Sequence, residues 1–151
     1  MGAGSKEAVK KMIFVDTNIW CYYFDARLLE HERVREPLRG ILRTEEIAVN
    51  TVTVMEVAHY LTRNLDEAEA REKVESFTKL SNMNIIDFDK ALMRTALEHL
   101  TKYAKSYALG GRDSTILASL DKFKIGTLLT HDKALGVLAQ KLGVKVIDPI
   151  T

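Results

Sequence analysis

Five short apolar segments alternate with longer stretches of helical character along this chain, and that alternation limits the fold more than any other feature. The apolar segments are MIFV (12–15), EIAVN (46–50), NIIDF (84–88), TLLT (127–130) and VKVID (144–148). Strands separated by helices are joined by crossover connections, which give a parallel sheet with both faces covered. The sequence therefore predicts an α/β fold, a three-layer α/β/α sandwich with a central, mostly parallel five-stranded sheet.

The stretches between these segments have the periodicity and the end signals of helices. Within residues 51–65, the apolar side chains recur along one side at helical spacing. We expect the helical region before the second strand to be interrupted near Pro37, because proline suits the first turn of a helix better than its interior. Glycines at 110 and 111 are expected to close the long helix that follows the third strand.

Length and composition are those of one globular domain. A chain of 151 residues can bury roughly two thirds of its unfolded surface. The formal net charge of +1 argues against a histone-like polycation. It does not exclude a nucleic-acid enzyme, because a basic rim around an acidic site leaves the total near neutral. We expect residues 1–11 to form a flexible leader and residues 12–151 to form a single domain.

Cysteine usage and hydropathy suggest where the protein works. Cys21 is the only cysteine, so an internal disulfide is impossible and a reducing interior is the simplest setting. Its aromatic neighbours in WCYYF (20–24) favour a buried, unreactive thiol and a core or subunit contact for the cluster, in preference to base stacking. The leader lacks the apolar stretch of a signal peptide, and no apolar run approaches the length of a membrane span. We expect a cytoplasmic protein.

Three aspartates occupy positions where a parallel sheet usually places its functional site. Asp16 directly follows the first strand, Asp132 follows the fourth, and Asp113 comes just after two glycines at a helix start. Ligands of such sheets bind beyond the carboxyl ends of the strands, at the point where the strand order reverses. Each aspartate also has a simpler interpretation, because aspartate is a preferred helix cap and is favoured in a first helical turn.

Glu56 is a weaker candidate on its own. It falls opposite the apolar stripe of its helix, where a solvated glutamate is the usual outcome. Its neighbours on that side, Val52 and Tyr60, are not strongly polar, so this side of the helix could instead line a site.

Taken together, these acids predict more than helix caps. If the first and fourth strands are neighbours, Asp16, Asp113 and Asp132 face one crevice, where several carboxylates raise one another's pKa unless a cation is present. A cluster of oxygen ligands selects a hard ion, Mg²⁺ or Mn²⁺. Such an ion can orient water, help it to ionise and neutralise the charge on a phosphodiester.

Four pieces of the chain, in order, resemble PIN-domain ribonucleases, most closely the VapC-type toxins of toxin–antitoxin systems. They are FVDTN near the start, Glu56 within a helix, GGRDSTILAS, and LLTHDKAL near the end. No single piece is specific, but their order and spacing are. The resemblance spans residues 12–150, nearly the whole chain.

The resemblance implies a Mg²⁺- or Mn²⁺-dependent endoribonuclease that hydrolyses RNA phosphodiester bonds. The family's acidic positions fall on Asp16, Glu56, Asp113 and Asp132, with Asp16, Asp113 and Asp132 as the metal ligands. Asn18 and Thr130 occupy positions of polar helpers that hold a carboxylate or a metal-bound water. We expect Arg112 to contact the RNA, with Arg39, Arg43, Lys122, Lys124 and Lys133 as further candidates.

The resemblance also implies partners. The expected substrate is single-stranded or looped RNA, since side chains cannot read bases within an A-form duplex. A VapC-type toxin implies a homodimer and a small antitoxin whose tail blocks the acidic crevice. An arginine is a suitable plug, because it keeps its charge and can bridge carboxylates.

Three alternatives remain open at this point. The nearest is a housekeeping PIN nuclease that matures ribosomal RNA. The second is a phosphatase with Asp16 as nucleophile, which usually requires another acid two residues later, where this chain has Asn18. The third is a non-catalytic binding module in which every acid is only a helix cap.

Overall fold

The computed structural model describes residues 11–151, in which five strands and seven helices alternate. The strands are β1 (Met12–Val15), β2 (Glu46–Asn50), β3 (Met83–Ile86), β4 (Thr127–Leu129) and β5 (Lys145–Ile147). The helices are α2 (Thr17–Phe24), α3 (His31–Thr44), α4 (Thr51–Asn64), α5 (Glu67–Thr78), α6 (Lys90–Tyr107), α7 (Gly111–Lys122) and α8 (Lys133–Lys141). Apart from Lys11, the predicted leader lies outside the described residues.

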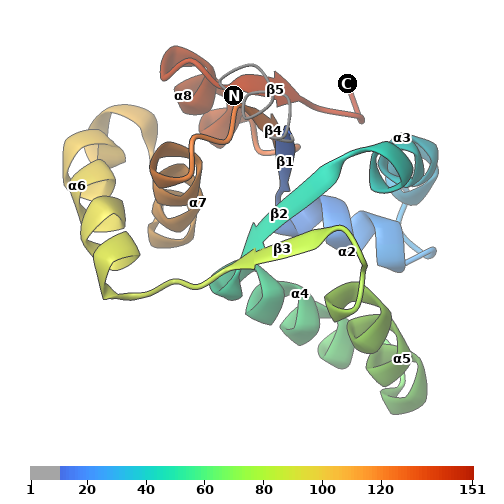
Figure 1. The fold of residues 1–151 in the computed structure, drawn as a ribbon. Helices are drawn as coiled ribbons and strands as arrows, with labels where there is room; N and C mark the ends of the chain where they lie inside the picture. The colour runs from blue at the N-terminus through green and yellow to red at the C-terminus, as the bar shows by residue number, and fades with distance from the viewer. Residues whose placement is uncertain (1–10) are drawn as a thin grey trace, which may run out of the picture.

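The five strands form one sheet in the order β3-β2-β1-β4-β5, and all four pairings are parallel. The predicted sandwich is therefore confirmed (Figure 1). The chain builds the sheet outward from β1, first through β2 and β3 and then, after α6 and α7, through β4 and β5 on the other side. The strand order thus reverses at β1, with β4 as its neighbour, so the carboxyl ends of these two strands meet at the switch point.

Alternate residues of the central strands feed two separate cores. Phe14, Ala48 and Leu128 pack against apolar side chains of α6, α7 and α8. Ile13, Val15 and their counterparts on β2 and β4 pack against α2 to α5 on the opposite face. Figure 1 shows these two helical layers on either side of the sheet. Both faces of the sheet are covered, which explains why its strands read as continuous apolar runs instead of alternating with polar residues.

One predicted interruption does not occur. Helix α3 runs unbroken through Pro37, which lies inside it. Proline lacks an N–H group, so the carbonyl of Arg33 loses its usual partner four residues on. Pro37 and Arg33 are both exposed, so water can hydrate that carbonyl and the helix continues.

The end of α6 also differs from the prediction. The helix stops at Tyr107, and Ala108, not a glycine, takes the left-handed backbone conformation there, with φ 54°. Gly110 has φ −89° and is the N-cap of α7. Only three residues separate the two helices, so the turn must begin directly after α6, on whichever residue stands there. A left-handed alanine costs about 1–2 kcal/mol.

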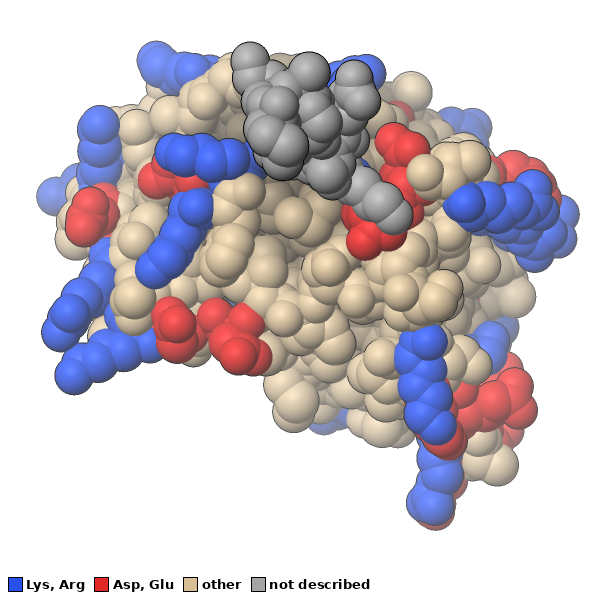
Figure 2. Space-filling model, viewed as in Figure 1, with Lys and Arg blue, Asp and Glu red and all other residues tan. Residues whose placement is uncertain are grey.

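Charged side chains of both signs lie on the face of the molecule shown in Figure 2. On the face shown in Figure 2, Lys and Arg side chains stand among Asp and Glu and do not gather into one basic patch. Among residues 11–151, none of the helices combines the length and apolar character that crossing a bilayer requires.

Asn50, the last residue of β2, joins the two helices that carry parts of the site. It is fully buried, and its Oδ1 accepts hydrogen bonds from the Thr53 backbone N–H at 2.8 Å and the Thr53 hydroxyl at 3.1 Å, capping α4. Its amide nitrogen donates to Ser119 Oγ on α7 at 3.1 Å. Because the whole side-chain amide is used, Asn50 fixes α4 against α7 as well as starting α4.

Asn50→Ala is therefore expected to lower the free energy of unfolding by about 2–4 kcal/mol, since it removes a cap and leaves buried polar groups of both helices unpaired. Asp66→Ala is the matched control. Asp66 caps α5 through a bond to the Glu69 N–H at an exposed position, and its loss should cost only about 1 kcal/mol. Urea unfolding of the two variants measures the difference, and equal losses would contradict this account of Asn50.

Candidate active site

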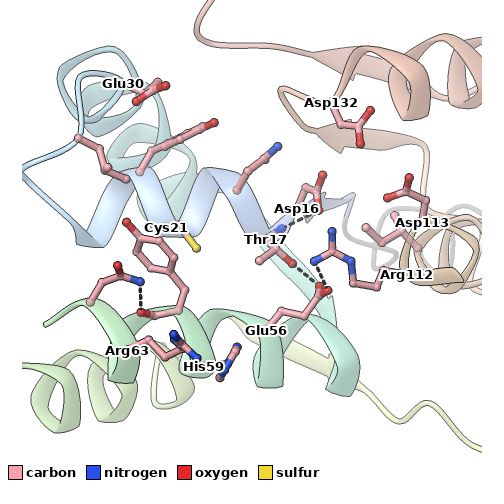
Figure 3. Close-up of a pocket in the computed structure, with 16 residues that line it drawn as sticks. Asp16, Thr17, Cys21, Glu30, Glu56, His59, Arg63, Arg112, Asp113 and Asp132 are labelled. Carbon is pink, nitrogen blue, oxygen red and sulfur yellow. Dashed lines mark hydrogen bonds and ion pairs between the residues drawn. The ribbon is translucent and has the colours of Figure 1, made fainter. Parts of the chain in front are cut away.

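The carboxyl ends of β1 and β4 open onto a cavity of about 780 Å³. All four acids singled out in the sequence line it: Asp16, Glu56, Asp113 and Asp132. Figure 3 shows that they come from separate elements and that their side chains point into a shared region. The fold thus brings together residues that are up to 116 positions apart, from 16 to 132.

Asp16 is the most enclosed of the four, with only 7% of its surface exposed. Its Oδ1 accepts a hydrogen bond from the Thr17 N–H at 2.7 Å, and its Oδ2 accepts one from the Thr130 hydroxyl at 2.7 Å. These bonds lower the pKa of the carboxyl, but burial raises it more strongly, and the nearby Asp113 and Asp132 add to the rise. The net result is a pKa of about 6.

Thr130 links the first acid to the last. Its hydroxyl donates to Asp16 and at the same time accepts from the Asp132 N–H at 3.0 Å, and the side chain is almost wholly buried. Asp132 Oδ1 in turn accepts from the Leu135 N–H at 3.0 Å, which caps α8. Capping and lining the cavity are therefore compatible for Asp132, because the cap uses only one of its two carboxylate oxygens.

Asp113 lies in the first turn of α7, directly after Arg112. Its pKa is raised, chiefly by burial and then by the charge of Asp132, while the charge of Arg112 opposes the rise. The charges of Asp113 and Asp132 thus make Asp16 less easily ionised, and the charge of Asp132 does the same to Asp113.

Glu56 is held in place and is not simply solvated. The Thr17 hydroxyl donates a hydrogen bond to Glu56 Oε1 at 2.7 Å, and Arg112 Nη1 forms an ion pair with Glu56 Oε2 at 2.7 Å (Figure 3). The side chain of Glu56 is 17% exposed, whereas that of Arg112 is 75% exposed. Arg112 therefore spans the rim of the cavity, with one end on an acid and the rest open to solvent.

Residues 13–141 match the sequence model of the PIN domain. The chain belongs to the PIN-domain family. The family predicted from the four sequence pieces is thereby confirmed. Comparison with curated protein sequences gives no match.

Solved structures agree with this fold. The crystal structure of VapC20 from Mycobacterium tuberculosis, a toxin that cleaves the sarcin–ricin loop, superposes with a TM-score of 0.70 at 16% identity, over 83% of this chain and 94% of that one. FitAcB from Neisseria gonorrhoeae gives 0.69 at 23% identity, over 91% and 98%. VapBC2 from Rickettsia felis, bound to a DNA fragment from its promoter, gives 0.67 at 17% identity, over 91% and 98%.

The donor set of this PIN domain suits a hard divalent ion, although its geometry is not yet that of an ion cage. Four carboxylates line the cavity, and Asn18 Oδ1 is a buried acceptor without a hydrogen-bond partner among the described residues. Oxygen ligands of this kind are those that Mg²⁺ and Mn²⁺ prefer. Across residues 11–151, however, no three Asp, Glu, His or Cys side chains are arranged to hold a common ion. Sharing an ion therefore requires these side chains to adjust.

Thr17, His59 and Arg63 line the cavity although the sequence did not predict it, and Tyr60 lies on the side of α4 that the sequence suggested could line a site. Thr17, which holds Glu56, stands beside Asp16, and His59, Tyr60 and Arg63 follow Glu56 along α4. Their spacing from Glu56, three, four and seven residues, is the spacing of one helical face, so the choice of Glu56 implied them. The basic candidates Arg39, Arg43, Lys122, Lys124 and Lys133 are not part of the cavity wall, whereas Arg112 is.

The aromatic segment 20–24 divides between core and cavity. Trp20 is fully buried and its indole N–H donates to the Val15 carbonyl at 3.1 Å, as a core residue should. Tyr22 and Cys21 line the cavity. Cys21 is buried, as predicted, and burial together with the charges of Asp16, Glu56 and Asp25 raises the pKa of its thiol to about 12, which disfavours the reactive thiolate.

The raised pKa of Asp16 predicts a pH dependence of stability in the presence of a chelator. The folded-state pKa of about 6 exceeds the unfolded value of about 3.9, so folding favours the protonated form. The contribution of Asp16 to the free energy of unfolding should therefore rise as the pH falls through 6 and level off below about 4, by about 2–3 kcal/mol in all.

Asp16→Asn removes this titration and keeps the shape of the side chain. Urea unfolding across the pH range should show the parent gaining stability relative to the variant as the pH falls. Histidines and carboxylates outside the cavity cancel in this comparison. Parallel pH profiles of the two proteins would contradict the assignment of a raised pKa to Asp16.

Proposed function

We propose that this PIN domain is a metal-dependent endoribonuclease and the toxin of a VapBC-type toxin–antitoxin pair. The observation that carries the proposal is the burial of Asp16 at the sheet's switch point, in one cavity with Asp113, Asp132 and Glu56. Membership of the PIN family supports it, and so does the likeness in fold to VapC20, described as a toxin that cleaves the sarcin–ricin loop.

Asp16, Asp113 and Asp132 are the residues that would hold Mg²⁺ or Mn²⁺; Asn18, whose buried amide oxygen has no hydrogen-bond partner among the described residues, lines the same cavity. When bound, such an ion would neutralise the carboxylates, orient a water molecule and make that water easier to deprotonate. The electrostatic strain shown by the raised pKa values of Asp16 and Asp113 favours this binding, since a cation relieves it.

The chain's own residues position the reacting groups. Thr130 fixes the orientation of Asp16 and, through the Asp132 N–H, the start of α8. Thr17 fixes Glu56. Arg112 is mostly exposed at the rim of the cavity. Its guanidinium can leave Glu56 and bind an entering phosphodiester, because a guanidinium can hydrogen-bond two phosphate oxygens at once. These contacts set the geometry before substrate arrives, which is what an orienting site requires.

Single-stranded or looped RNA is the proposed substrate, because side chains cannot read the bases within an A-form duplex. A homodimer and a small antitoxin are the proposed partners. In the Arg112–Glu56 ion pair, a guanidinium is bound to one of the cavity's acids. An arginine from the antitoxin tail could block the cavity by binding its acids in the same way. A gene for a small DNA-binding protein directly upstream would favour the toxin over a housekeeping nuclease.

Cleavage is the direct test. A panel of purified RNAs incubated with the protein and Mg²⁺ or Mn²⁺ should yield discrete fragments, and a chelator should abolish them. The cleavage rate should fall by more than about a hundredfold in each of the variants Asp16→Asn, Asp113→Asn and Asp132→Asn. This loss is larger than the roughly 10- to 100-fold typical of residues that only hydrogen-bond to a metal ligand.

Asp66→Asn is the matched control for that assay. It makes the same chemical change at an aspartate that caps α5, outside the cavity, and should cut as the parent does. Cleavage by Asp16→Asn at the parent's rate would contradict the proposed site.

Metal binding can be measured without any RNA. Mn²⁺ at concentrations well above its Kd should raise the melting temperature of the parent, because an ion that binds only the folded state stabilises it. The rise should be lost in Asp132→Asn and retained in Asp66→Asn. An unchanged melting temperature in the parent would favour the alternative in which the aspartates act only as caps.

A further inference from the structure

The cavity continues well beyond its acidic end, and its far part has a different character. Along α4 the wall passes from Glu56 through His59 and Tyr60 to Arg63, and Tyr22 of α2 also lines it. Figure 3 shows Arg63 at the end of the cavity remote from Asp132 and Asp113, with Glu30 on the opposite side. One continuous space therefore joins a cluster of carboxylates to an arginine and aromatic rings.

Arg63 differs from the other arginine of the cavity in having its charge available. Arg112 is paired with Glu56, whereas the side chain of Arg63 has no ion pair or hydrogen bond to any residue within 11–151. Other arginines of the chain, like Arg112, form ion pairs: Arg27 with Asp25, Arg39 with Glu36, and Arg71 with Glu67. An unpaired guanidinium that faces a cavity is suited to an anionic ligand.

The wall around Arg63 is held rigidly. Asp25 is buried, and its carboxylate accepts hydrogen bonds from the Tyr60 hydroxyl at 2.7 Å and from Arg27 Nη2 at 2.9 Å. Arg27 Nη2 also donates to the Asn64 carbonyl at 2.7 Å, next to Arg63 in the chain. These bonds tie the last turn of α4 to the end of α2, so the ring of Tyr60 and the backbone of Arg63 are fixed before any ligand enters.

We propose that this far part of the cavity binds the nucleotide next to the cleaved bond, with Arg63 on its phosphate and Tyr22 against its base. The proposal rests on the proposed function and adds a substrate requirement to it: a single strand that extends past the scissile phosphodiester along α4. Arg63 lies seven positions after Glu56, a rise of about 10 Å along the helix. A nucleotide next to the cleaved bond can span this distance. Phosphate contact and aromatic contact together are the usual means of holding a single strand.

The test is equilibrium binding of a fluorescein-labelled oligouridylate, an unstructured single strand, over a range of salt concentrations. All proteins carry Asp16→Asn and are measured with Mg²⁺ present, so that binding is followed without cutting under the proposed function. Arg63→Gln should weaken binding about tenfold and reduce the slope of log affinity against log salt by about 0.7, the value for one phosphate contact with a single strand. Arg63→Lys should keep most of the slope.

Two further variants separate the contributions. Tyr22→Leu should weaken binding about fivefold or more with an unchanged salt slope, because it removes an aromatic contact and no charge. Arg71→Gln is the matched control: Arg71 lies on α5 outside this cavity, paired with Glu67, and should bind as the reference protein does. Thermal unfolding confirms that each variant is folded.

An affinity and salt slope for Arg63→Gln equal to those of Arg71→Gln would overturn the proposal, as would failure of the reference protein to bind the oligouridylate. Neither result bears on RNA cleavage by the parent protein, which is measured separately. Cleavage that depends on Asp16 together with binding that is indifferent to Arg63 would retain the nuclease and reject this subsite.

Discussion

The Asp16 carboxylate is buried at the point where the strand order of the sheet reverses, and the organisation of the site follows from how that charge is accommodated. β1 lies between β2 and β4, so the residue after β1 is enclosed by neighbours on both sides. A hydroxyl from the β4 side and a backbone N–H from α2 stabilise the ionised form. They do not fully offset the burial, and two further carboxylates increase the deficit. A cation bound near Asp16, as proposed, would offset this deficit.

Two residues that cap helices in this protein also line the candidate site. Asp16 and Asp132 cap the helices that follow their strands, and those caps are what fix the carboxylates at the mouth of the sheet. A cap needs only one oxygen of the pair, which leaves the second free for another role, as Thr130 illustrates at Asp16. Capping a helix and lining the cavity are therefore compatible for these two aspartates, and the cap alone does not exclude the proposed role in a site.

Much of the fold could be predicted because its signals are local. Apolar runs such as 12–15 and 46–50 and the helical periodicity between them determine the element order, and crossover geometry determines the parallel sheet. The errors at Pro37 and Ala108 arose where solvent exposure or a short connection outweighed local preference. Such effects depend on tertiary surroundings, which a single sequence does not contain.

The site was predictable in its acids and less so in its contacts. Asp16, Asp113 and Asp132 follow strands or open helices, so a general rule of parallel sheets located them. Glu56 depended on the family resemblance, because nothing nearby in the sequence shows that Thr17 and Arg112 would hold it. Arg63 was not predicted, because it stands out only by having no ion pair among the described residues. Which surface charges of α2, α4 and α5 pair with one another depends on how these helices pack, and a single sequence does not show that.

The most direct measurement of the central claim is the anomalous scattering of Mn²⁺ in a crystal of the protein. We predict a peak at the carboxyl ends of β1 and β4, from an ion coordinated by Asp16, Asp113 and Asp132 after their side chains have moved together. A well-ordered crystal soaked in Mn²⁺ with no peak in that cavity, or with Mn²⁺ bound only elsewhere, would contradict it.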